Sequence, residues 1–361
     1  RRAALDLAVW IGEIESDARK DASNGMDDDT AVIRAAAEGE NQRLKVLIDA
    51  GCSVGSRDRR GFTALSSAAC NGYGDCLELL IERGSDLEAR TDQGETALFL
   101  ACRYGHRSCV EILLNRGGDM LCQSKRKSSC LMAAAEYGHL HIVELLCHRD
   151  EADRLLHLQN DKGWTCLHVA ARQGHVAIVK FLVHRGGTAL VQKKDKSGRT
   201  SLHCAARSWR SAQPGAQTEV VQILEDTMEL DVSDADAQGR NSLHLACLYG
   251  HHELVRKIID MPQGGSLLQS RDKLGLSCLH LTARGGALSV AAELLASARA
   301  QSPIADAAAG LLEARAKDGR TCLHWAAANG KRKLVGLLVE KSLELLGPER
   351  SRDLVLAQRN D

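Results

Sequence analysis

One motif recurs along the chain at a nearly constant interval, and it restricts the fold more than any other feature. Residues 163–178 read GWTCLHVAARQGHVAI, and the threonine of this stretch has counterparts throughout the sequence. The first four counterparts lie 33 residues apart, and the later ones lie 35 to 44 residues apart. They are Thr30, Thr63, Thr96, Ser129, Thr165, Thr200, Asn241, Ser277 and Thr321. A period of this size predicts stacked supersecondary units instead of separate compact domains.

Each unit begins with a short predicted helix. The hydroxyl or amide residue is followed by an apolar residue two positions later and by a small pair five and six positions later, such as Ala170 and Ala171. These positions share one face of a helix. A glycine nine positions after the hydroxyl residue predicts a left-handed helix end, which glycine adopts without strain. These glycines are Gly39, Gly72, Gly105, Gly138, Gly174, Gly250, Gly286 and Gly330.

A second helix is predicted after each glycine. Its apolar residues recur at helical spacing, as in Leu77, Leu80 and Ile81, and form one buried stripe. Polar stretches such as RDRRG and AKDGR then predict tight turns that link one unit to the next. The sixth unit departs from this pattern, because Trp209 occupies the glycine position and residues 208–217 predict a longer loop. The predicted fold is all-α.

The complete pattern resembles the ankyrin repeat family, whose motif is G-x-T-P-L-H-x-A-A-x-x-G-H-x-x-(V/I)-(V/I)-x-x-L-L. Nine positions of the fifth unit match this motif: Thr165, Leu167, His168, Ala170, Ala171, Gly174, His175, Val179 and Leu182. The resemblance covers residues 28–361 as about nine repeats, the last one incomplete at its end. It implies a solenoid of stacked helix-turn-helix units with short β-hairpin-like loops. Residues 1–27 are predicted to form an N-terminal capping helix and a linker.

Two departures from the family motif concern the start of the first helix. The family proline is absent from every unit, and this absence is expected to weaken each helix start slightly. Its place is taken by Ala31, Ala64, Ala97, Cys130, Cys166, Ser201, Ser242, Cys278 and Cys322. The family histidine is missing from the first four units, where Ile33, Ser66, Phe99 and Met132 stand in its place.

The stretch that contains Cys166, His168 and His175 raises the question of a metal site or a thiol active site. Its recurrence favours a structural role, and the chain contains no C-x-x-C pair and none of the common nucleotide, hydrolase or zinc-protease motifs. By resemblance, the repeated histidine bridges the capping residue and the backbone of a neighbouring repeat. These histidines are His168, His203, His244, His280 and His324. The sequence therefore predicts no catalytic, cofactor-binding or metal-binding residue, no cofactor and no enzyme activity.

Composition sets the expected compartment and the class of partner. Thirteen cysteines are spread through a long helical sequence, and this pattern favours reduced thiols in the cytoplasm, with the nucleus as the alternative compartment. The formal net charge is +0, so no nucleic acid partner is expected. No long apolar run predicts membrane insertion in this segment. The chain begins without Met and is interpreted as an excerpt of a longer protein.

The predicted function is non-catalytic binding of a protein partner through the concave face and the hairpin tips, as a scaffold or adaptor or as a subunit of a larger assembly. Its alternative is a cytosolic regulatory region of a larger membrane protein or enzyme, such as a channel, palmitoyltransferase or kinase. Basic residues recur at the predicted turn tips and suggest an acidic partner surface or peptide. They are Arg57, Arg59, Arg60, Lys125, Arg126, Lys127, Lys193, Lys194, Lys196, Arg271, Lys273, Arg315 and Lys317.

Two alternatives stay open at the sequence level. The basic residues could be a solvated face interrupted by acidic neighbours, which are Asp58, Asp92, Asp195, Asp272 and Asp318. Four units also insert an apolar doublet before the turn, and these doublets could pack under the loop or contact a partner. The doublets are Leu155-Leu156, Leu190-Val191, Leu267-Leu268 and Leu311-Leu312.

Overall fold

The computed structural model describes most of the chain, in residues 28–207, 215–228, 233–301 and 306–356. These residues form α-helices joined by turns and loops, and the only strand-like pairing among them is an isolated antiparallel bridge between Gln123 and Ser129. The predicted all-α fold is confirmed. The predicted capping helix and linker at residues 1–27, and the irregular position Trp209, lie outside the described residues. None of the described helices is long and apolar enough to span a membrane.

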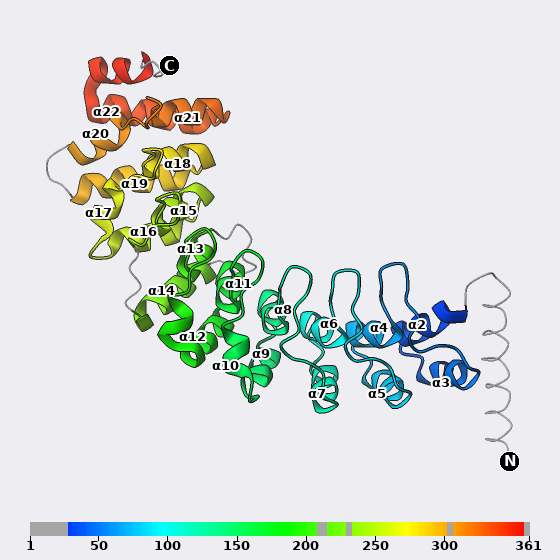
Figure 1. Cartoon of the computed structure of the whole chain (residues 1–361). Helices are drawn as coiled ribbons and strands as arrows, with labels where there is room; N and C mark the ends of the chain where they lie inside the picture. The colour runs from blue at the N-terminus through cyan, green and yellow to red at the C-terminus, as the bar shows by residue number, and fades with distance from the viewer. Residues whose placement is uncertain (1–27, 208–214, 229–232, 302–305, 357–361) are drawn as a thin grey trace, which may run out of the picture. The chain divides into compact units, whose positions relative to one another are not determined.

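The chain divides into two compact units, Arg1–Cys166 and Leu167–Asp361. In the first unit the helices come in pairs, and like members of successive pairs pack against each other. Figure 1 shows the loops of this unit projecting side by side from one edge. The helices are α2 (Asp28–Glu38), α3 (Asn41–Asp49), α4 (Ala64–Asn71), α5 (Gly74–Glu82), α6 (Ala97–Tyr104), α7 (Arg107–Asn115), α8 (Cys130–Tyr137), α9 (Leu140–Cys147) and the short α10 (Ala152–Leu156).

The second unit repeats this arrangement with longer second helices and added short helices. Its first helices pack in the order α13, α15, α18 and α21, and its second helices pack in the order α12, α14, α16, α19 and α22. The helices are α11 (Cys166–Gln173, beginning at the unit boundary), α12 (Val176–Val191), α13 (Ser201–Ala206), α14 (Ala216–Met228), α15 (Ser242–Tyr249), α16 (His252–Asp260), α17 (Gly264–Gln269), α18 (Cys278–Gly285), α19 (Leu288–Gln301), α20 (Asp306–Glu313), α21 (Cys322–Ala328) and α22 (Arg332–Leu356).

From Thr63 on, the repeated hydroxyl or amide residue directly precedes the first helix of its pair, whereas Thr30 lies inside α2. Thr96 has extended backbone angles, and its side chain accepts a hydrogen bond from the Phe99 amide at 3.3 Å. Ser129 does the same for the amide of Met132 at 3.3 Å. Each contact satisfies one of the amides that have no partner within the helix, and such a cap stabilises a helix by about 1 kcal/mol. The sequence repeat thus marks the start of each first helix from Thr63 on, and the helix predicted to start after Thr30 starts earlier, at Asp28.

The turn glycine ends the first helix, and the next repeat packs directly on it. All eight predicted glycines have left-handed backbone angles, with φ between 66° and 90°. At Gly105 an added Cβ would lie 2.6 Å from Cε1 of His139. The His139 ring also donates from Nε2 to the carbonyl of Arg103 at 2.9 Å, and this bond satisfies a carbonyl near the end of α6. Gly105 therefore serves both the turn and the contact between repeats.

The inserted apolar doublets belong to the core. All eight residues of the four doublets are buried, with exposed fractions of 4% or less. Three of the four doublets lie in the added helices α10, α17 and α20, and the fourth ends α12. The packing interpretation of these insertions is confirmed.

The inserted helices also explain why a cysteine suits the helix start where the family motif has proline. The thiol of Cys166 lies 3.7 Å from the carbonyl of Leu156, and the thiol of Cys322 lies 3.8 Å from the carbonyl of Leu312. Both are weak S–H···O contacts between a first helix and the insertion that precedes it. Proline has no side-chain donor and would leave these carbonyls without that contact. The two helices that begin at Cys166 and Cys322 thus have a thiol contact that the proline of the family motif would not provide.

Truncation of a doublet tests its place in the core. Leu312 has no exposed surface, so Leu312→Ala should lower the free energy of unfolding by about 2 to 5 kcal/mol. The exposed Lys317→Ala, five residues away, should change it by about 0.5 kcal/mol or less. Urea unfolding followed by circular dichroism measures both. Equal small effects would mean that the doublet does not contribute to the core.

The turn glycines allow a second test, because two of them differ in surroundings. Gly105→Ala and Gly330→Ala both place a side chain at positive φ, which costs about 1 kcal/mol. Only Gly105 meets a neighbour, since nothing lies within 4 Å of an added Cβ at Gly330. Gly105→Ala should therefore be the more destabilising change, by the further loss of the His139 contact. Equal unfolding midpoints for the two variants in urea would contradict the proposed packing.

Candidate functional site

The loop before a first helix ends in a compact tip, and in six of the described tips the side chain of the first residue holds the tip together. Asp58 begins the first of these tips, and its Oδ1 accepts hydrogen bonds from the amides of Arg60 at 2.8 Å and Phe62 at 2.7 Å. The same pattern of acceptance from the second and fourth following amides occurs at Thr91, Asn160, Asp195, Asp236 and Asp272. The side-chain oxygen accepts hydrogen bonds from turn amides that have no partner in a β-ladder.

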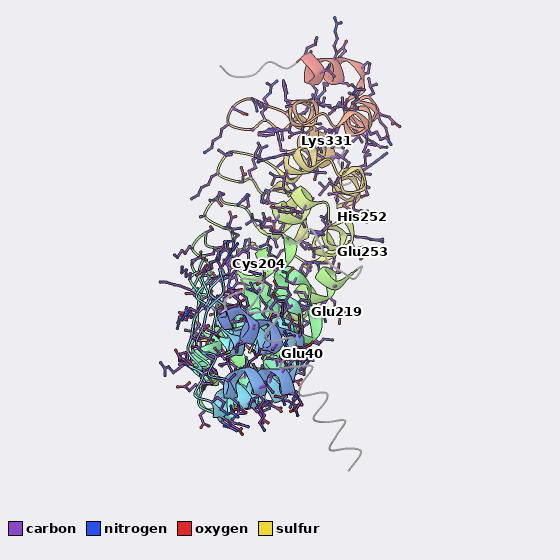
Figure 2. The ribbon with its side chains drawn as sticks, turned by 90° about the vertical axis from the view of Figure 1, so that its right-hand side faces the viewer. Glu40, Cys204, Glu219, His252, Glu253 and Lys331 are labelled. Atoms are coloured by element: carbon purple, nitrogen blue, oxygen red, sulfur yellow. The ribbon has the colours of Figure 1, made fainter. Side chains whose placement is uncertain are left out.

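Backbone hydrogen bonds hold successive tips in register within each unit. In the first unit the amide of Asp92 donates to the carbonyl of Arg60 at 3.0 Å, and the amide of Lys125 donates to that of Gln93 at 2.8 Å. Equivalent bonds of 2.8 to 2.9 Å link the later tips of the second unit, for example from Lys273 to Gln238. In Figure 2 the yellow and orange loops of that unit project side by side. The predicted alignment of the tips is confirmed within each unit.

The orientation of the tip aspartates corrects an expectation from the sequence. Asp195, Asp236 and Asp272 are only 4% to 8% exposed, because their carboxylates accept the amides of their own tips. Burial alone would raise the pKa of Asp236, but hydrogen bonds from Arg240 hold it below its ordinary value. Asp58 is half-buried for the same reason. These residues do not interrupt the outer surface as charged neighbours; Asp92 is exposed and does.

The predicted basic residues occupy the outer side of the tips, but they are not equivalent. All are exposed except Lys193, which is half-buried. Two of them also hold the loops together: Arg57 donates from Nη1 to the carbonyl of Arg90 at 2.7 Å, and Arg271 donates to that of Arg315 at 2.9 Å. Lys194 is paired with Asp234 at 3.2 Å. The other exposed cations at the tips are Arg59, Arg60, Lys125, Arg126, Lys127, Lys196, Lys273, Arg315 and Lys317, of which Arg60 lies over the Phe62 ring at 5.0 Å.

Three of the repeated histidines, His168, His203 and His280, contact a carbonyl of the next repeat as the resemblance implied, whereas Nε2 of His244 is buried without a hydrogen-bond partner among the described residues. In the second unit, Nδ1 of His203 accepts from the Thr200 hydroxyl at 2.9 Å, while Nε2 lies 3.1 Å from the carbonyl of Arg240 in the next repeat. His280 makes the same two contacts, with Ser277 at 2.8 Å and Arg320 at 3.1 Å. The bridge requires a neutral ring, because Nδ1 acts as an acceptor. These rings join a helix cap to the adjacent loop.

A cluster on the inner helices of the first unit was not singled out from the sequence. Arg103 on α6 is paired with Glu95 at 2.6 Å, and its guanidinium lies 5.7 Å from the ring centre of Phe99 and 5.8 Å from that of Tyr137. Tyr104 and Tyr137 are 49% and 51% exposed at equivalent positions of successive repeats. The sequence signal is a tyrosine directly before the turn glycine in two consecutive units. The cluster presents two half-exposed aromatic rings at the ends of α6 and α8, directly before the turn glycines.

The thiols are poorly suited to nucleophilic chemistry. All thirteen cysteines are free, and eleven of them are buried, Cys102 and Cys247 included. Burial raises the pKa of Cys204 to about 12, and it does the same to Cys322. Cys204 lies among the helices in Figure 2. The described residues contain no group of three or more His, Cys, Asp or Glu side chains arranged to hold a metal ion.

Comparisons with known proteins agree with this geometry. A family model described as ankyrin repeats (3 copies) matches residues 5–91, 84–154 and 151–233. Models of single ankyrin repeats match residues 238–266 and 318–344. Among solved structures, the crystal structure of the human ASB11 ankyrin repeat domain is 29% identical in sequence and gives a TM-score of 0.51. The similarity covers 60% of this chain and 90% of that domain.

The histidine bridges predict loss of stability in mild acid. Burial lowers the pKa of His168, His203, His244 and His280 below the ordinary value of 6.5. The unfolded chain therefore binds more protons than the folded one as pH falls through 6.5 toward the lowered values, and the free energy of unfolding must decrease over that window. Urea midpoints at about pH 7.5 and about pH 5.5 measure this change.

A double variant identifies the source of that acid sensitivity. His203→Asn with His280→Asn should be less stable than the parent near neutral pH, because both bridges are lost. Its stability should then depend less on pH, because two of the four buried rings are gone. The exposed His184→Asn is the control for removal of a surface imidazole. A double variant with the same pH dependence as the parent would exclude these rings as the cause.

Proposed function

Because this chain belongs to the ankyrin repeat family, we propose that it is a non-catalytic adaptor that binds an acidic segment of a protein partner through its hairpin tips and the adjoining inner helices. Ankyrin repeats are protein-interaction modules, which supports a protein partner. That the partner surface is acidic is a further part of the proposal. The fold alone does not identify a partner, so the proposal depends on the chemistry of the surface.

The observation that carries the proposal is the opposite orientation of charges at the tips. The carboxylates of Asp58, Asp195 and Asp272 accept amides of their own loops, whereas Arg59, Lys196 and Lys273 in the same tips are exposed. An outer edge of this kind attracts carboxylates at long range and accelerates association. Formal neutrality of the whole chain is compatible with it, because carboxylates such as Asp195 and Asp272 count in the net charge but are buried in their own loops.

The inner helices of the first unit would supply short-range contacts. Tyr104 and Tyr137 are each about half exposed, and Tyr137 is held against Arg103. Rigid tyrosine side chains provide large contact area with little loss of conformational entropy, and Tyr and Arg are enriched among residues that dominate binding energy. Tips held in register by backbone hydrogen bonds also lose little entropy on binding.

The same binding function fits two contexts. The repeats could act as a separate scaffold or adaptor in the cytoplasm, or as the regulatory region of a larger membrane protein or enzyme. Sequence beyond residues 1–361 decides between them, and a catalytic or membrane-spanning segment there would favour the second context. A nucleic acid partner is not part of the proposal.

Removal of tip cations in the first unit tests the proposal. Arg59, Arg60, Lys125 and Arg126 are exposed, so their joint change to Ser should leave folding nearly unchanged, at about 0.5 kcal/mol or less per site. Association with the native partner, once captured by affinity purification and then produced in pure form, should slow by about tenfold at low salt. The difference should shrink near 1 M salt, where the Debye length is about 3 Å.

A matched control removes the same number of charges from elsewhere in that unit. Lys45, Arg107, Arg116 and Arg154 are exposed on or beside the second helices and α10, away from the tips. Their joint change to Ser should leave the association rate close to that of the parent. If both variants associate equally fast, or if the tip variant matches the parent at both salt concentrations, the basic tips are a solvated face and the proposal fails.

A further inference from the structure

One tip of the first unit breaks the pattern of all the others. The fourth tip residue is a glycine with φ between 72° and 80° in seven tips: Gly61, Gly94, Gly163, Gly198, Gly239, Gly275 and Gly319. In the third tip, residues 124–127, the fourth residue is Lys127 with φ 56°. Lys127 is the only residue other than glycine with a positive φ in the described parts of the chain. A lysine there costs about 1 kcal/mol relative to glycine.

The surrounding hydrogen bonds impose this conformation on Lys127. Its amide donates to the carbonyl of Ser124 at 2.8 Å, and its carbonyl accepts from Nε2 of Gln123 at 2.7 Å. The amide of Ser128 donates to the Ser124 hydroxyl at 3.2 Å. All three contacts involve the backbone of residue 127 or its neighbours, and glycine would keep them. Folding stability therefore does not account for the lysine side chain.

The charges of this tip are uncompensated by its own residues. Lys125, Arg126 and Lys127 are exposed, and their side chains make no salt bridge or hydrogen bond to any described residue. The first tip position, which carries an inward carboxylate in several other tips, is the neutral Ser124. The neighbouring tips present Gln93 and Asp92 on one side and Asp161 and Lys162 on the other. The tip thus concentrates three adjacent cations.

We propose that the tip formed by residues 124–127 is the principal contact for a cluster of carboxylates in the partner, and that Lys127 is a specificity-determining residue kept in a strained conformation for its ammonium group. The inference rests on the proposed function and assigns it to one tip. Strain that the fold does not require points to a use of the side chain itself. Three exposed cations on a fixed turn bind a short acidic segment without prior rearrangement.

The neighbouring tips favour an acidic peptide over a nucleic acid. Exposed carboxylates at Asp92 and Asp161 flank the three cations along the row of tips. A regular polyanion that followed the row would meet both carboxylates, whereas a short acidic segment can contact residues 125–127 alone. The site therefore fits a compact group of Asp or Glu side chains.

The test compares Lys127→Gly with Lys273→Ser, which removes one exposed, unpaired cation from a tip of the second unit. The probe is a fluorescein-labelled synthetic peptide of alternating Glu and Ser residues, and binding to the whole chain is followed by fluorescence anisotropy. Lys127→Gly should raise the urea midpoint, because it removes the strain at φ 56°. It should also weaken binding by about two- to fivefold. Higher stability with lower affinity separates a binding role from damage to the fold.

Each other outcome has a defined meaning. If Lys127→Gly binds as the parent does, or no more weakly than Lys273→Ser, the assignment to this tip is wrong; loss of binding in the fourfold tip variant would then still support the proposed function. If the parent itself does not bind the peptide, both the assignment and the acidic partner class fail. A short DNA duplex that binds the parent more tightly than the peptide does would replace the acidic peptide by a polyanion and overturn the inference.

Discussion

The polar groups at the ends of short helices must find partners in the next repeat, and the rest of the structure depends on this constraint. A first helix such as α6 (Ala97–Tyr104) has eight residues, so a large share of its amides and carbonyls lack partners within the helix. Thr96 satisfies an amide at its start, and His139 from the following repeat satisfies the Arg103 carbonyl near its end. A single repeat cannot complete its own hydrogen bonding, and stacking is the structural consequence.

The position three residues after the helix cap carries side chains of different chemistry in the two units. In the first unit Phe99 and Met132 fill the position with buried apolar side chains. In the second unit His203 and His280 fill it with rings that bond to the next loop. Apolar packing does not depend on protonation, whereas the histidine bridge requires a neutral ring. Both solutions leave the tips in register within their unit, so the outer edge keeps its form while the interior varies.

The tips separate the residues that build the loop from those available to a partner. Asp195 is 7% exposed and holds its loop together, while the adjacent Lys196 is exposed. Because the carboxylate bonds to amides inside the loop, its charge contributes to folding, and the lysine beside it defines the outer surface. Adjacent residues of opposite charge thus have separate roles. The tip at residues 124–127 departs furthest from this division, since it has cations outside and no carboxylate within.

The sequence by itself determined the all-α repeat fold, the helix starts at residues such as Thr96 and the left-handed glycines, because these depend on local backbone preference and on spacing along the chain. The bridging role of His203 was implied by the resemblance to the ankyrin repeat family, and the next repeat supplies the Arg240 carbonyl that the ring contacts. Tertiary structure alone decided that Asp195 faces inward, that Arg57 bonds to Arg90, and that Lys127 takes a left-handed conformation. The sequence gives the charge of a side chain but does not show whether that side chain faces into its loop or toward solvent. The direction of a side chain follows from which amides and carbonyls neighbouring loops leave unsatisfied, and only the folded chain brings those groups together.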